Sequence, residues 1–138
     1  EWKPLDSLRV VANYAWQNAE DKELDEDAAR APEQQAYLRA HWTLAHNWSV
    51  TGEFKWIADR NREHLDPRDA VDDYTIANLN LEKQNLFERL DLGLRVRNLF
   101  DEGASEPSPY EAVPSGSLMP DDFPLEERSL HLTARVRF

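Results

Sequence analysis

The stretch RSLHLTARVRF, residues 128–138, alternates strictly between polar and apolar side chains from its second residue onward. Its apolar residues are Leu130, Leu132, Ala134, Val136 and Phe138. A period of two predicts a β-strand with one apolar face and one polar face. The aromatic Phe138 ends this strand on its apolar face.

Five earlier segments alternate in the same way, at residues 8–17, 35–45, 48–59, 74–81 and 89–98. The apolar positions are even-numbered in every segment except 74–81, where they are odd-numbered. The exceptions on the polar face include Ile57, Tyr74 and Ile76. A helix would scatter each of these apolar sets around its axis. The chain is therefore predicted to be an all-β, antiparallel, up-and-down meander of about six strands.

The connections between these segments are alternately long and short. The long ones cover residues 18–34, 60–73 and 99–127, and the short ones cover 46–47 and 82–88. Tight turns at one rim and large loops at the other are typical of a membrane barrel. Segments of about 8 to 12 residues suit strands that cross a membrane at a tilt. Only residues 20–31 fit a short helix, which Pro32 would end.

The charge of the chain is divided between loops and strands. The 138 residues carry a net charge of −11, which argues against a nucleic-acid partner, because phosphate binding needs an excess of Lys and Arg. Of the 27 acidic residues, 20 lie in 19–34, 60–73 and 101–127. Neither Asp25–Asp27 nor Asp121–Asp122 belongs to a spaced calcium-loop motif. We expect these loops to be solvated, mutually repelling surfaces without a metal site.

Several classes of protein find no support in the sequence. The chain has no cysteine, so it has neither a disulfide framework nor a thiolate metal site. No arrangement of Ser, His and Asp points to catalysis, and we expect neither an enzyme nor a cofactor. No run of roughly 18 apolar residues could form a transmembrane helix. The chain begins at Glu1 with neither an initiator Met nor a secretory signal, so we expect a processed protein or a piece of a longer one.

Basic residues on the polar faces are the candidate binding residues. They are Arg39, Lys55, Arg95, Arg97 and Arg135. A guanidinium can hold an anionic ligand through two parallel hydrogen bonds. The same side chains can instead solvate the interior or pair with neighbours such as Asp91 and Glu53, and we favour that interpretation over direct contact with a ligand.

Tryptophan residues lie near the ends of the predicted strands, on the apolar face. Trp16 and Trp56 lie near one rim, and Trp48 and Phe138 lie near the other. At the rise of a tilted strand, Trp48 and Trp56 would be separated by roughly 20 Å along the membrane normal. Trp16, Trp48 and Trp56 are therefore predicted to be membrane-interface aromatics.

Three stretches of the sequence are specific beyond their alternation, namely YTIANLNL at 74–81, VRNLFD at 96–101 and ERSLHLTARVRF at 127–138. They resemble the end of a TonB-dependent receptor of Gram-negative outer membranes. The most specific part is the tetrad Asn98, Leu99, Phe100 and Asp101, which is followed by a loop and a strand that ends in Phe. The resemblance covers nearly all of the chain. It implies that residues 1–138 are the last six strands of a 22-strand transmembrane barrel, without the plug domain.

The resemblance also implies a function and a set of partners. The whole receptor would sit in the outer membrane and take up a scarce ligand, usually a ferric siderophore and sometimes cobalamin, haem or a glycan. Its partners would be outer-membrane lipid, its own plug domain, TonB and the barrel-assembly machinery. That machinery would read Leu130, Leu132, Ala134, Val136 and Phe138 as an assembly signal. The five basic residues would face the lumen or the plug, and the long loops would gate or recognise the ligand.

The competing class is a small soluble β-barrel or sandwich that binds a hydrophobic ligand, because its strands alternate as well. Six strands cannot close a barrel of receptor size. We therefore expect the isolated chain to oligomerise, to pair its edges with a neighbour, or to collapse into a small barrel or sandwich. The sequence upstream of Glu1 distinguishes the two classes. A plug domain and about sixteen further strands would identify the receptor, and a signal peptide directly before Glu1 would favour the soluble barrel.

Replacing Phe138 by Asn in the full-length protein is expected to reduce outer-membrane assembly several-fold, because the terminal aromatic residue would be lost from the assembly signal. The amount of folded protein in the outer-membrane fraction, compared with the unchanged protein, measures this effect. Unchanged assembly would contradict the role of Phe138.

Overall fold

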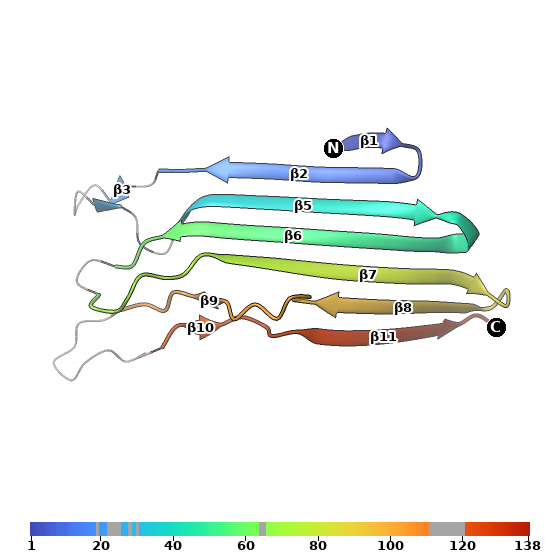
Figure 1. Cartoon of the computed structure of the whole chain (residues 1–138). Coiled ribbons are helices and arrows are strands. Elements are labelled where there is room, and N and C mark those ends of the chain that lie inside the picture. Colours follow the sequence, from blue (N-terminus) through green and yellow to red (C-terminus); the bar gives the residue numbers. More distant parts are fainter. Residues whose placement is uncertain (19, 22–25, 28, 30, 64–65, 111–120) are drawn as a thin grey trace.

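One open, seven-stranded antiparallel sheet forms most of the molecule (Figure 1). The structure is a computed structural model and describes residues 1–18, 20–21, 26–27, 29, 31–63, 66–110 and 121–138. The strands of the sheet, in spatial order, are β1 (Trp2–Leu5), β2 (Leu8–Trp16), β5 (Pro32–Leu44), β6 (Trp48–Arg60), β7 (Tyr74–Leu86), β8 (Leu90–Arg97) and β11 (Ser129–Val136). The spatial order follows the chain order, so the predicted up-and-down meander is confirmed.

Two small hairpins lie outside this sheet. β3 (Glu20–Asp21) pairs with β4 (Glu26–Asp27), and β9 (Ser105–Glu106) pairs with β10 (Phe123–Pro124). The short helix predicted over 20–31 is therefore wrong at the described residues. This acidic stretch offers no apolar stripe by which a helix could pack against the sheet.

A single turn of 3₁₀-helix, η1 (Ala45–Asn47), joins β5 to β6. In the part of the chain that the structure describes, no helix is both long and apolar enough to cross a membrane.

The six predicted strands are all present, and β1 is a seventh that the sequence pattern did not reveal. β1 has only four residues, and its pairing with β2 is irregular between Trp2 and Leu5, a stretch that contains Pro4. Four residues are too few to display an alternation. β7 continues five residues beyond the predicted end at Leu81, which leaves residues 87–89 as a tight turn to β8.

The register places the apolar residues of all the long strands on one face. One row across the sheet consists of Val10, Ala40, Gly52, Leu79, Val96 and Leu130. The apolar positions are even-numbered in β2, β5, β6, β8 and β11 and odd-numbered in most of β7, as predicted. In β7 the pairing shifts between Lys83↔Leu92 and Leu86↔Leu90, and Asn85 has a left-handed φ of 56°. This bulge inserts one residue and returns Leu86 to the apolar face.

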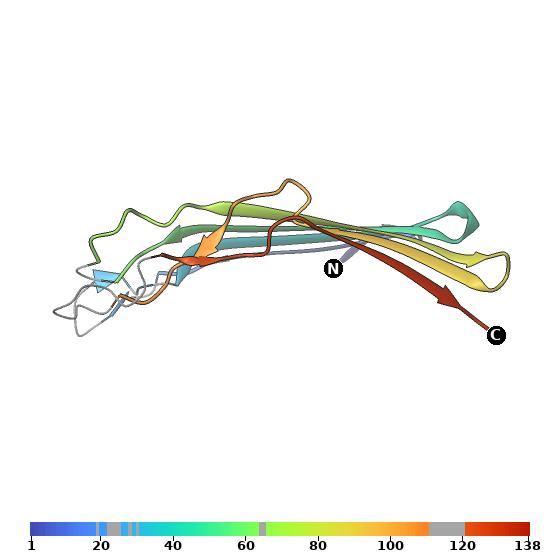
Figure 2. The same cartoon turned by 90° about the horizontal axis from the view of Figure 1, so that it is seen from below.

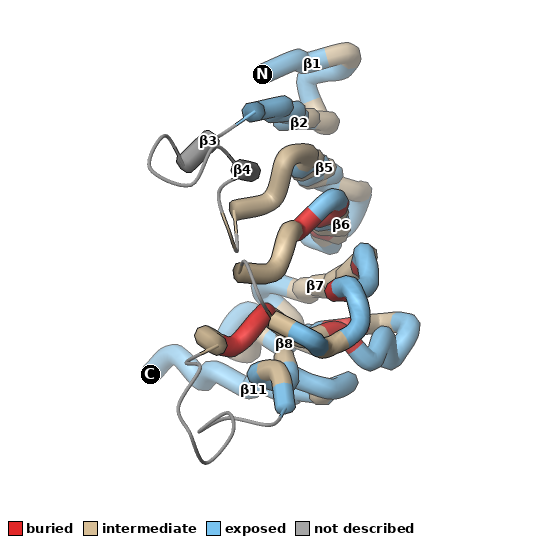
Figure 3. The backbone as a smooth tube through the Cα atoms, turned by 90° about the vertical axis from the view of Figure 1, so that its left-hand side faces the viewer, coloured by how far each residue is buried: buried red, intermediate tan, exposed pale blue. Residues whose placement is uncertain are grey.

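The sheet is a single curved layer. Figure 2 shows its curvature from below, and Figure 3 shows the strands following an arc when they are viewed end-on. The long connections gather at one end, and the C-terminus lies at the other (Figure 1). The edge strands β1 and β11 each have one partner within the described residues. Within the described residues no second layer covers the apolar face, so the structure does not adopt the collapsed small barrel or sandwich. The alternatives of oligomerisation and of edge pairing with a neighbour stay predictions.

Most of the apolar face is exposed, although Val96 on that face is buried, and the buried cluster lies elsewhere. Trp42 and Leu132 on that face are 48% and 81% exposed. The buried cluster consists of Ile57, Tyr74 and Ala104, with Ile76 and Leu125 packed against it. Ile57, Tyr74 and Ile76 are the exceptions to the alternation, and the loop after β8 folds back to cover them. Their apolar character on the polar face therefore has a structural reason.

The turn between β7 and β8 carries backbone strain. Phe87 has a φ of 50°, and its side chain is 84% exposed. A left-handed conformation costs a residue with a Cβ about 1–2 kcal/mol, and Asn adopts it more readily. Replacing Phe87 by Asn is expected to raise the free energy of unfolding by about 0.5–1 kcal/mol, as measured by urea unfolding of the protein in lipid vesicles. Phe100, which is 71% exposed and outside the left-handed region, provides the control. A Phe87→Asn protein no more stable than Phe100→Asn would contradict the strain.

Candidate ligand-facing surface

The polar face of β8 and β11 brings together basic residues from the two strands. Across the pair, Arg97 lies opposite Ser129, Arg95 opposite His131, and Asp91 opposite Arg135. Gly93 lies opposite Thr133 and contributes no side chain, so the surface is hollowed there. The hollow has a volume of about 470 Å³, and its lining includes Asn80 and Glu82 of β7.

Three of the five candidate basic residues have a partner in the structure. Arg39 Nε lies 3.6 Å from Glu53 Oε1, as the sequence suggested. An Arg97 guanidinium nitrogen lies 2.8 Å from Glu126 Oε2, and Lys55 Nζ donates a hydrogen bond of 3.2 Å to Tyr74 Oη. The positions of these residues on the polar face are as expected, and a role toward a plug or a ligand stays a prediction.

The other two, Arg95 and Arg135, form no ion pair within the described residues. Asp91, which the sequence suggested as a partner, pairs instead with Arg137 and accepts a hydrogen bond of 2.8 Å from Asn85 N. Arg95 and Arg135 line the hollow together with the carboxylates of Glu82 and Asp91, and guanidinium groups that form no ion pair can bind an anion through paired hydrogen bonds.

The tetrad Asn98–Asp101 forms the turn at the base of the last long loop. Asn98 is 2% exposed, and its Nδ2 donates to the carbonyl oxygens of Glu102 (2.9 Å) and Glu126 (3.0 Å). Its Oδ1 accepts a hydrogen bond of 2.9 Å from Glu102 N. Asn98 thus joins the two ends of the loop between β8 and β11.

The residue types of the tetrad have a backbone reason as well. Asn98 and Asp101 have φ angles of 47° and 58°, and Asn and Asp are the residues besides Gly that most readily adopt this conformation. Asp101 also accepts a hydrogen bond of 2.9 Å from Arg128 N at the start of the last strand. In this structure the tetrad has a structural role, because its hydrogen bonds hold together the two ends of the loop between β8 and β11; we call it the loop clasp.

A group of ion pairs lies where the loop over residues 60–73 meets the loop over residues 99–127. The sequence pattern did not predict this group. Two guanidinium nitrogens of Arg62 donate to Asp122, over 2.9 and 2.6 Å. Arg68 binds Asp66 in the same forked manner. The only signal in the sequence was the set of apolar residues that break the alternation, which marked the strand ends that these loops cover.

These pairs change the ionisation of the two carboxylates. The hydrogen bond from Arg62 is the main cause that lowers the pKa of Asp122 from 3.8 to about 2, and the one from Arg68 lowers the pKa of Asp66. A carboxylate whose pKa is lower in the folded than in the unfolded state stabilises the fold above its unfolded pKa. The stabilisation from Asp122 is therefore present at neutral pH and is lost as the pH falls from about 4 toward 2.

Both carboxylate oxygens of Asp122 accept hydrogen bonds from Arg62, which disfavours the calcium alternative at Asp121–Asp122. No group of three or more His, Asp or Glu residues suited to a metal occurs within the described residues. The other candidate, Asp25–Asp27, lies partly outside the described residues, and nothing is described of its side chains.

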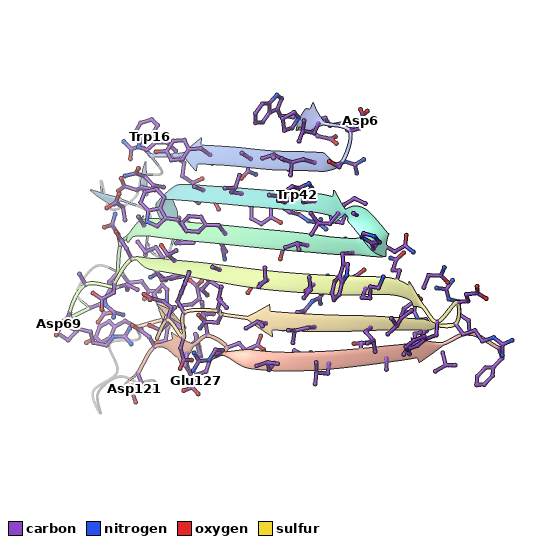
Figure 4. All side chains as sticks on the ribbon, turned by 45° about the vertical axis from the view of Figure 1, so that its right-hand side comes forward. Asp6, Trp16, Trp42, Asp69, Asp121 and Glu127 are labelled. Atoms are coloured by element: carbon purple, nitrogen blue, oxygen red, sulfur yellow. The ribbon has the colours of Figure 1, made fainter. Side chains whose placement is uncertain are left out.

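The aromatic residues lie at the predicted ends of the strands. Trp16, which is 64% exposed, lies at the loop end of β2 (Figure 4). The register places Trp56 near the same end in β6. Trp48 lies at the opposite end beside Lys83, whose Nζ is 5.8 Å from the centre of the Trp48 ring. In β11 the exposed apolar residues are Leu130, Leu132 and Val136, and Phe138 follows the end of the strand. Their roles as membrane-interface aromatics and as an assembly signal stay predictions.

Comparison with known proteins identifies the fold. It is the fold of a segment of the transmembrane barrel of a TonB-dependent receptor. The similar solved structure is the closed form of the ferric-catecholate import receptor Fiu from E. coli K12, with a TM-score of 0.73 and 21% sequence identity. The match covers 98% of this chain and 19% of that chain, so the chain spans about a fifth of the length of that receptor. No protein-family model and no curated protein matches the sequence. The predicted fold is confirmed.

Replacing Asn98 by Ala is expected to lower the free energy of unfolding by about 2–4 kcal/mol, because the buried Asn98 side chain would lose three part-buried hydrogen bonds, one with Glu102 N and two with the carbonyl oxygens of Glu102 and Glu126. Urea unfolding of the protein in lipid vesicles measures this. In the matched control, Asn80→Ala, only a half-buried hydrogen bond of 2.8 Å to Glu82 is lost, and less than about 1 kcal/mol is expected. Equal effects of the two substitutions would show that Asn98 is no clasp.

Proposed function

We propose that the chain is the C-terminal part of the barrel of an outer-membrane receptor that actively imports a scarce ligand, namely a ferric siderophore. The observation that carries the proposal is the division of the long strands into an apolar and a polar face, which is broken mainly by Ile57, Tyr74 and Ile76 at the rim. An exposed apolar face across a whole sheet is unfavourable in water and favourable in lipid. The chain would then lie in the outer membrane of a Gram-negative bacterium, with its apolar face toward lipid.

The placement of aromatic and basic residues supports this orientation. Trp16 and Trp48 mark opposite ends of the apolar face, which suits the two interfaces of a membrane. The cation of Lys83 lies near the ring of Trp48, a position from which a lysine can extend toward the interface. The long loops would face outward, and the tight turns would face the periplasm.

The polar face would line the lumen and face the plug domain of the full-length protein. Arg39, Lys55 and Arg97 have partners within the sheet, so we assign them to the lumen wall. Arg95 and Arg135 would contact carboxylates of the plug or an anionic ligand. Iron bound by catecholate groups is such an anion, and a catecholate is the ligand class named for the similar receptor. TonB and the barrel-assembly machinery would be the partners of the whole receptor.

Nothing favours the alternative of a small soluble barrel. Such a protein encloses its ligand in an apolar interior, whereas here the apolar face lies open and the hollows are lined mainly by polar side chains.

Uptake of a radioactive ferric tris-catecholate complex by the cells that carry the gene, under iron limitation, tests the proposal. Deleting the gene or adding an uncoupler is expected to abolish uptake, because import through such a receptor requires energy. The double substitution Arg95→Gln and Arg135→Gln is expected to reduce uptake roughly tenfold, since a hydrogen bond to a charged group contributes about 1.5–3 kcal/mol.

Arg9→Gln is the matched control, because Arg9 lies on the polar face of β2 and its Nε pairs with Glu1 over 3.0 Å. Uptake in the control should match that of the unchanged protein. Uptake that survives deletion of the gene would disprove the proposed ligand, and equal uptake by the double variant and the control would remove Arg95 and Arg135 from the ligand path.

A further inference from the structure

We propose that the two long loops after β6 and β8 form one rigid element, the rim buttress, and do not open independently. The rim buttress is defined by residues 60–63, 66–74, 102–110 and 121–126. Figure 4 shows Asp69 of the first loop and Asp121 of the second at the same end of the sheet. The consequence for ligand passage rests on the proposed function, but the rigidity of the rim buttress does not.

An apolar contact seats the second loop on the sheet. Ala104 is buried against Ile57 of β6 and Tyr74 of β7, which are 4% and 3% exposed, and Leu125 packs on the same cluster. Leu125 N donates a hydrogen bond of 2.9 Å to Ala104 O, so the two sides of the loop are joined at the apolar cluster. Lifting this loop would expose the cluster to water and lose its burial free energy.

Arg60 connects this apolar cluster to both loops at once. Its side chain is 1% exposed and stacks on the ring of Tyr74 at 4.8 Å. One terminal nitrogen donates to Ser105 O over 2.7 Å and to Glu106 Oε2 over 3.2 Å, and the other donates to Asp72 O. Tyr74 Oη donates to Glu106 Oε1 over 2.7 Å. Separation of the loops would leave a buried guanidinium without its acceptors, which is strongly unfavourable.

Arg62 and Asp122 form the second connection. Their forked pair joins the first loop to the second, and the side chains are 13% and 16% exposed. Asp122 Oδ1 also accepts a hydrogen bond of 3.1 Å from Ser108 N, on the opposite side of the second loop. One carboxylate therefore holds three segments together.

Arg68 and Glu63 make the third connection. Arg68 binds Asp66, whose side chain is 2% exposed, and donates to Ser108 Oγ over 2.6 Å and to Ser108 O over 2.9 Å. Glu63 Oε2 accepts a hydrogen bond of 3.1 Å from Tyr110 N. Each connection is charge-assisted, and its arginine side chains are at most 16% exposed, although Glu106 is 41% exposed. Such contacts are stronger and less screened than those at an open surface.

The arrangement assigns different roles to different parts of the rim. The rim buttress covers the polar face at the loop ends of β6 and β7 and stays in place while a ligand passes. Movement that admits the ligand would then fall to other parts of the receptor, in contrast to a gate formed by these two loops.

Hydrogen exchange of the purified full-length protein in lipid, followed by mass spectrometry, tests the coupling. Asp122→Asn changes only the second loop, yet it is expected to raise exchange at least about tenfold in residues 66–73 of the first loop as well as in 102–110. Asp121→Asn, which removes the same charge at the neighbouring exposed residue, should change exchange by less than about twofold in either loop. The double variant Arg62→Gln and Asp122→Asn should raise exchange by less than the product of the two single effects, because both single changes remove the same Arg62–Asp122 pair.

Faster exchange in 102–110 alone, with 66–73 still protected, would overturn the proposal, as would a loss of protection across the whole sheet in Asp122→Asn. In a second arm, the ferric tris-catecholate complex is added to the unchanged protein. Unchanged exchange in both loops supports a fixed rim buttress, and deprotection of either loop contradicts it. The first arm needs no ligand, so a failure of the proposed transport function would be distinguishable from a failure of the coupling.

Discussion

Antiparallel pairing in a continuous register is the constraint on which the rest of the molecule depends. Side chains alternate along a strand, so a slip of one residue in any pair would turn an entire apolar set to the opposite face. The register avoids this from β2 to β11, across rows such as that of Val10 and Leu130. Where the pairing does shift, at Asn85, the extra residue returns Leu86 to the apolar face. The apolar and the polar face of the sheet can then each contact an environment of matching polarity.

The rim shows how the same sheet supports a second kind of packing. At the loop ends of β6 and β7 the polar face carries Ile57 and Tyr74, which would be unfavourable if they were left in contact with water. The loop after β8 covers them, and Asn98 clasps the base of that loop. Arginine–carboxylate pairs then join this loop to its neighbour. The buried cluster of the described residues therefore lies at the rim, whereas most of the apolar face in the middle of the sheet is exposed.

The alternation of polar and apolar residues predicted the features of the fold that depend on local sequence. The six long strands, their faces and the division into tight turns and long loops follow from an alternation that any pairing must respect. β1 was missed because a strand of four residues that contains Pro4 displays no period. The predicted helix over 20–31 failed where Glu20 and Asp21 pair with Glu26 and Asp27, since propensity is weak compared with hydrogen bonding between neighbouring segments. For the basic residues, the sequence predicted the face on which Arg95 and Arg135 lie. It did not predict that the neighbouring Arg97 and Arg137 would form the ion pairs with Glu126 and Asp91.

The sequence by itself determined the six long strands, their two faces and the turn chemistry, because a period of two and residues such as Asn98 and Asp101 act over a few neighbours. Only the tertiary structure decided that Arg137 rather than Arg135 pairs with Asp91, and that Arg62 meets Asp122 across two loops. These contacts join residues 46 and 60 positions apart. No local pattern specifies such a pair, because it depends on how the loops fold back over the sheet.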